Sequence, residues 1–134
     1  MKTRSLLIMA ALFIILLFSG CNTVPESIDA DLAPIEFFQL GQEASNKTNY
    51  EAALLYYQTF IDRFPEDAQR IVEAEFEIAN IYYKLDDLQK ADEMFTAILE
   101  KYNQPGADVL PAWPKILSEK QLATVQEKSK EAVE

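Results

Sequence analysis

The sequence contains no histidine, one cysteine and only three glycines among its 134 residues. Without histidine, the side chain that most often transfers protons near neutral pH is missing, and so is the imidazole metal ligand. One cysteine allows no disulfide within the chain, and three glycines are too few for a glycine-rich phosphate-binding loop. We therefore expect no enzyme activity: no catalytic residue, no metal and no cofactor.

Positive charge is also scarce, since 12 basic residues stand against 22 acidic ones. Nucleic-acid binding depends on neutralising phosphates, so this balance argues against such partners. Among the acidic residues, Glu73 and Glu77 are four apart and would share one face of a helix. That spacing leaves a weak divalent-cation site open, but no calcium-loop pattern accompanies it. The interpretation we favour is a solvated helix surface.

A long apolar run occurs once, over residues 6–18, and it directly follows Lys2 and Arg4. Its 13 residues are fewer than the roughly 20 that a helix needs to span the hydrocarbon core of a bilayer. A short basic region, a run of this length and the small pair Ser19-Gly20 are typical of a cleaved export signal. We predict a signal peptide over residues 1–20.

The only cysteine, Cys21, comes next, and residues 17–21 (LFSGC) resemble a bacterial lipobox. The resemblance implies a lipoprotein in which the Cys21 thiol carries a diacylglyceryl group, with acyl chains such as palmitate anchoring the mature chain in a membrane. Asn22 stands where enterobacterial inner-membrane lipoproteins have aspartate, which implies an outer-membrane position facing the periplasm. The alternative is an incidental cysteine at the end of a membrane segment.

Residues 21–33 lack a clear period, and we interpret them as a lipidated N-terminus and tether. From Pro34 onward the apolar residues follow a helical period without β-type alternation. Proline suits the first turn of a helix, where its missing N–H is not needed. The pattern predicts an all-α domain with helices near residues 34–47, 50–64, 67–84, 88–102 and 112–129.

The first four of these helices form two similar pairs. Ala53 recurs as Ala91 and Tyr57 as Phe95, in each case 38 positions later, and the pair Leu40-Gly41 recurs as Ile78-Ala79. Small residues at fixed places let two helices approach closely, and aromatic residues fill the space between neighbouring hairpins. A repeated hairpin has an exposed apolar side that stacking buries.

This pattern resembles the tetratricopeptide repeat. The signature positions are Leu40, Gly41, Ala53, Tyr57, Pro65, Ile78, Ala79, Tyr82, Ala91 and Phe95. The first copy (34–65) fits the signature well, whereas the second (72–103) has Glu75 at an apolar place and Asn103 in place of proline. The resemblance implies a short right-handed α-solenoid. The lengthened repeat and the lipobox also look like the BamD (YfiO) lipoproteins of outer-membrane assembly, which have about five repeats.

Residues 104–134 are expected to form a loop and a C-terminal helix that caps the second hairpin. Trp113, Ile116, Leu117 and Ala123 suggest its apolar face, with Trp113 as the largest buried group. Replacing Trp113 with alanine should then cost about 3–5 kcal/mol. A loose tail or a docking strip for a partner is the alternative.

The resemblance implies a protein–protein interaction module whose first helices line a concave surface. The positions carried over are Ile35, Phe38, Gln42, Ser45 and Asn46, then Glu73, Phe76, Asn80, Tyr83 and Lys84. For Phe38 and Phe76 a place in the core is an equal alternative. The lysine clamp that some members use for C-terminal carboxylates is absent.

We expect protein partners in the cell envelope and a membrane contact through the acyl chains, with the oligomeric state open. The other function considered is an accessory subunit that presents a small ligand to an envelope transporter, which would need a deep pocket.

Overall fold

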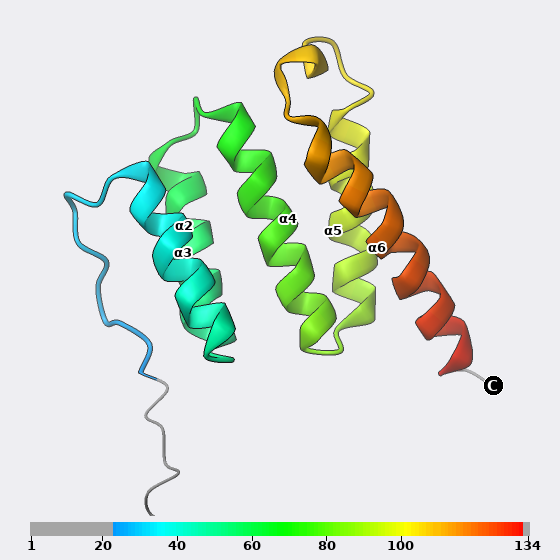
Figure 1. Ribbon diagram of the computed structural model, residues 1–134, viewed down its shortest axis with the longest axis horizontal. Coiled ribbons are helices and arrows are strands. Elements are labelled where there is room, and N and C mark those ends of the chain that lie inside the picture. The colour runs from blue at the N-terminus through cyan, green and yellow to red at the C-terminus, as the bar shows by residue number, and fades with distance from the viewer. Residues whose placement is uncertain (1–22, 133–134) are drawn as a thin grey trace, which may run out of the picture.

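The computed structural model describes residues 23–132, and every regular element in that range is helical, which confirms the all-α prediction. The signal peptide and Cys21 lie outside the described residues. The elements are α2 (Pro34–Asn46), α3 (Tyr50–Arg63), α4 (Ala68–Lys84), α5 (Leu88–Lys101), a 3₁₀ turn η1 (Ala107–Val109) and α6 (Ala112–Glu131). Figure 1 shows two antiparallel hairpins, α2–α3 and α4–α5, side by side, with α6 along the second.

The helix starts follow from the local sequence. Pro34 opens α2, and the Glu36 carboxylate accepts the backbone N–H of Ala33 at 2.7 Å. Asparagine or aspartate caps the next three helices by accepting a backbone N–H in the first turn. These caps are Asn49 for α3, Asp67 for α4 and Asp87 for α5.

The 38-residue repeat extends to the turns between paired helices. Thr48 and Asp86 are 38 positions apart, and both have a left-handed backbone, with φ of 57° and 64°. Each directly precedes a cap residue, Asn49 or Asp87. The two hairpins therefore turn through the same backbone conformation, although their turn residues differ.

The crossing of α2 and α3 is the tightest packing in the first hairpin. Gly41 of α2 lies against the ring of Tyr57, and a Cβ at Gly41 would come within 2.7 Å of that ring. Tyr57 is only 1% exposed. Phe37 and Phe60 pack edge to face beside this crossing, with ring centroids 6.1 Å apart. The missing side chain of Gly41 is thus what admits a full aromatic ring between the helices.

The central helix α4 has two buried faces. Ala74, Ile78 and Ile81 join the core of the first hairpin, whereas Val72, Phe76 and Ala79 join a second core with α5 and α6. Both sets follow helical spacing, and they lie on different sides of the helix. α4 therefore couples the two hairpins into one stack.

The segment before α2, expected to be a tether, packs on the first hairpin. Val24, Ile28 and Leu32 lie against its core. The guanidinium of Arg63 donates to the carbonyl oxygens of Asp29 and Ile28, at 2.6 and 3.0 Å. We call residues 23–33 the strap, which Figure 1 shows in blue running along the first hairpin.

The C-terminal helix α6 packs along α5, but with a different face from the one expected. The buried residues of α6 are Pro114, Ser118 and Val125, and Leu122 packs against the second core beside Val125. Ile116 and Leu117 are 61% and 40% exposed, and Ala123 is exposed too. The buried residues follow helical spacing on a neighbouring face, which includes the polar Ser118, so apolar character alone pointed to the wrong face.

The contact between Gly41 and Tyr57 yields a stability prediction. In the Gly41→Ala variant the new Cβ would lie 2.7–3.0 Å from three ring atoms of Tyr57. Overpacking costs about 1–3 kcal/mol, which outweighs the gain of up to about 1 kcal/mol in helix propensity. We expect a lower free energy of unfolding in urea denaturation. In a Tyr57→Leu background the clash is removed, so the same substitution should cost little. An equal cost in both backgrounds would contradict the steric explanation.

Candidate binding groove

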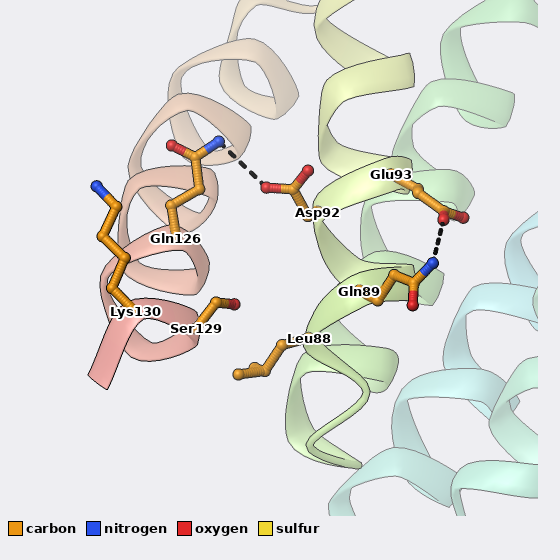
Figure 2. A pocket seen from close by; sticks show the side chains of 7 residues that line it. All are labelled: Leu88, Gln89, Asp92, Glu93, Gln126, Ser129 and Lys130. Carbon is orange, nitrogen blue, oxygen red and sulfur yellow. Dashed lines mark hydrogen bonds between the residues drawn. The ribbon is translucent and has the colours of Figure 1, made fainter. Parts of the chain in front are cut away.

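Two hollows on the described part of the chain are large enough to hold part of a ligand. One, of about 830 Å³, lies between the start of α5 and the end of α6, where Leu88 and Gln126 are among its lining residues. Figure 2 shows two pairs of its polar side chains bonded to each other: Gln126 donates to Asp92 at 3.1 Å, and Gln89 donates to Glu93 at 3.1 Å. This hollow offers few unpaired groups, despite its size.

The second hollow, of about 570 Å³, lies between α2 and α4 over a floor made by α3. We call it the α2–α4 groove. Its lining residues include Phe38, Gln42 and Asn46 of α2, Tyr57 of α3 and Glu77 of α4. Neither hollow is an enclosed cavity, so the deep pocket required for a small-ligand subunit is not found among the described residues.

The floor of the α2–α4 groove is aromatic and firmly packed. The rings of Phe38 and Tyr57 meet edge to face with centroids 5.7 Å apart, and Phe38 also meets Phe60 at 5.0 Å. Phe38 is half-buried, so it belongs to the core and to the groove at once. The core alternative considered for this residue is therefore met in part, and its role in binding stays a prediction.

Two ionisable groups in the groove are perturbed by burial. Loss of water raises the pKa of the Tyr57 hydroxyl far above its usual value, and the nearby charge of Glu77 adds to the effect. Loss of water also raises the pKa of the Glu77 carboxyl, and Lys84 offsets part of that rise. Glu77 makes no hydrogen bond or ion pair with the part of the chain that the structure describes. The expectation of a solvated surface does not fit this glutamate.

On α2, the residues expected on the concave surface divide into groove and core. Gln42 and Asn46 are exposed at the rim, where the Gln42 amide donates to Asn46 at 3.2 Å. Ser45 is buried, and its hydroxyl accepts a hydrogen bond from the Lys84 ammonium at 3.2 Å. Ile35 is exposed and does not line the groove.

On α4, the expected concave residues do not form a second groove, because α6 covers most of them. Phe76 is 4% exposed and packs in the second core, which was the equal alternative to a place on the binding surface. Trp113 of α6 stacks edge to face on Phe76 at 5.2 Å and donates to Glu73 at 3.2 Å. Lys128 lies 5.5 Å from the ring centre of Tyr83. Asn80 is half-buried.

Most residues of the repeat signature are buried in the helix packing, unlike the residues expected on the concave surface. Gly41, Ala53, Tyr57, Ile78, Ala79, Ala91 and Phe95 are buried, Leu40 and Tyr82 are half-buried, and Pro65 is exposed. Glu75, at a place where an apolar residue is usual, forms an ion pair with Lys101 of α5. That pair joins the two helices of the second hairpin at the position of the missing apolar contact.

Glu77 was not expected to line a groove, and Tyr57 was expected only as a buried residue between the hairpins. Helical spacing places Glu77 on a face with Glu73 but does not tell which neighbour covers it. The close approach of α2 to α3 brings Tyr57 and Phe38 beside this glutamate. Glu77 lies 38 residues after Gln39, which also lines the groove. This repeat spacing was the one feature of the sequence that could have pointed to Glu77 as a groove residue.

The comparisons with known proteins agree with this architecture. Residues 73–103 match the family model of the tetratricopeptide repeat. The matched segment is the second hairpin, although the first copy (34–65) fits the repeat signature better residue by residue. Tetratricopeptide repeats form non-enzymatic interaction folds, which suggests a protein–protein interaction module here.

One related protein comes from Treponema pallidum (strain Nichols) and is described as uncharacterized. It is 34% identical over 94 residues, which cover 69% of this chain and 38% of that protein. The chain thus spans well under half the length of this relative. No solved structure matches the chain significantly.

Across residues 23–132, no helix is both long and apolar enough to cross a membrane. No group of three or more histidine, cysteine, aspartate or glutamate side chains in this range is arranged to hold a metal ion.

The position of Trp113 changes the expected cost of removing it. Trp113 is 38% exposed, with its indole N–H bonded to Glu73 at the surface, so it is not the largest buried group. We expect Trp113→Ala to lower the free energy of unfolding by about 1–2 kcal/mol, for the partial burial and the ring contact. Phe95→Ala, in the core, should cost about 3–5 kcal/mol. Thermal unfolding of both, with exposed Ile116→Ala as control, tests this order. An equal loss for Trp113 and Phe95 would contradict the partial burial.

Proposed function

We propose that this chain is a membrane-anchored bacterial lipoprotein that binds a partner protein of the cell envelope in the α2–α4 groove. The observation that carries the proposal is the groove itself: an aromatic floor with exposed amides at the rim, between the first hairpin and α4, the first helix of the segment that matches the tetratricopeptide repeat. Apolar contact area beside a few polar groups is what peptide recognition requires.

The strap supports the anchoring part of this proposal. Its first described residue, Thr23, is two positions from Cys21, and its carbonyl accepts a hydrogen bond from the Asn49 amide at 3.2 Å. Asn49 lies in the turn between α2 and α3. A lipid on Cys21 would therefore hold this turn close to the membrane surface.

The most specific version of the function is a role in outer-membrane protein assembly. It rests on the resemblance of the lipobox and the lengthened repeat to the BamD group. Two hairpins provide a smaller surface than about five repeats, so the chain would contact one segment of a partner. An outer-membrane position facing the periplasm belongs to this proposal.

Site-specific photocrosslinking tests the groove. A photoreactive amino acid in place of Gln42, at the groove rim, should yield a discrete crosslinked product in intact cells. The same replacement at Gln58, exposed on α3, is the matched control and should yield none. Mass spectrometry of the product should identify an envelope protein. Equal products at both positions, or none at Gln42, would contradict binding in the groove.

The anchor has a separate test. Mass spectrometry of the mature protein should find residue 21 at the N-terminus with the mass of attached acyl chains. An unprocessed Met1 or an unmodified Cys21 would refute the lipoprotein assignment and leave the interaction module standing.

A further inference from the structure

The Glu77 carboxylate in the α2–α4 groove is half-buried and makes no hydrogen bond or ion pair within the described part of the chain. Lys47 also lines the groove, but its ammonium pairs with Glu43 at 2.6 Å. Lys84, seven residues further along α4, lowers the pKa of Glu77 in part but makes no ion pair with it. Its ammonium donates to the Ser45 hydroxyl at 3.2 Å and lies 5.9 Å from the ring centre of Tyr50.

A partly desolvated carboxylate without an ion-pair partner does not help the chain to fold, because taking a charge out of water is unfavourable. The upward shift in the pKa of Glu77, which comes from loss of water, reflects this penalty. The penalty is partial, since the Glu77 oxygens are not among the fully buried unpaired atoms of the described residues. A glutamine would avoid the charge at nearly the same size. A ligand that supplies a positive charge would offset the loss of water.

The surroundings of Glu77 fit a cationic side chain. Phe38 and Tyr57 line the same groove, and aromatic rings attract ammonium and guanidinium groups. Hydrogen bonds between such cations and a carboxylate are among the strongest in proteins. The formal net charge of the whole chain, −10, also attracts a basic partner at longer range.

We infer that the α2–α4 groove binds its partner through a lysine or arginine side chain whose cation pairs with the Glu77 carboxylate. This inference rests on the proposed function and names the chemistry of the partner. The aliphatic stem of that side chain lies over Phe38, and the partner backbone meets the amides of Gln42 and Asn46 at the rim. A divalent cation is a poorer occupant, because the other carboxylate of the groove, Glu43, is paired with Lys47 at 2.6 Å. No group of three or more candidate metal ligands lies among the described residues.

A random dodecapeptide library provides the probe, screened against the full-length protein in nonionic detergent micelles. The tightest binders should contain lysine or arginine. Replacing that residue with norleucine, which keeps the stem and removes the charge, should weaken binding about tenfold. In the Glu77→Gln variant the two peptides should bind equally. The matched control, Glu100→Gln on the exposed side of α5, should keep the tenfold preference.

Each outcome of this experiment decides a separate point. A preference for the basic residue that survives in Glu77→Gln, or that falls equally in Glu100→Gln, would overturn the pairing with Glu77. Binders that lack basic residues but lose affinity in a Phe38→Ala variant would overturn the inference and leave the groove as the binding surface. A library without binders would overturn both the pairing with Glu77 and the groove as the binding surface. Thermal unfolding should show Glu77→Gln to be at least as stable as the parent chain, so loss of binding would not reflect misfolding.

Discussion

The close contact between Gly41 and the Tyr57 ring organises much of the first hairpin. Because Gly41 has no side chain, α2 approaches α3 closely enough to seal the ring between them. Phe38 then packs on the edge of Tyr57, and Glu77 of α4 comes to lie beside it. The groove between α2 and α4 is thus a consequence of this helix crossing. The second hairpin repeats the crossing with Ala79 in place of Gly41, but α6 covers the corresponding inner side.

Much of the architecture was predictable because it depends on local chemistry. Helix starts follow from Pro34 and from capping side chains such as Asn49 and Asp87, and the 38-residue repeat follows from residue types at fixed places. The failures concern packing between elements. α6 was expected to bury Trp113 and Ile116, yet it buries Pro114 and Ser118, a face that apolar character alone did not reveal. The strap was expected to be a linker because its sequence has no clear period. Its hydrogen bonds go to Arg63, more than 30 residues away along the chain, and the local sequence does not reveal them.

The contrast between local chemistry and packing between helices also explains which site residues could be predicted from the sequence. Phe38 and Gln42 were expected in the groove from their repeat positions, and both line it. Phe76 holds the position equivalent to Phe38, but Trp113 stacks on it and the second core encloses it. Glu77 resembled any surface glutamate on an acidic helix. Its burial and lack of a partner arise from how α2, α3 and α4 come together, which residue spacing along one helix does not reveal.

The central claim is that the groove formed at this helix crossing binds a cationic segment of a partner. Nuclear magnetic resonance of the isotope-labelled full-length protein in micelles, titrated with a lysine-containing library peptide, tests it most directly. The account predicts that the largest amide shift changes fall on Phe38, Gln42, Tyr57 and Glu77. Shift changes concentrated instead on exposed Ile116 and Leu117 of α6, or on Leu88 and Gln126 of the larger hollow, would contradict it.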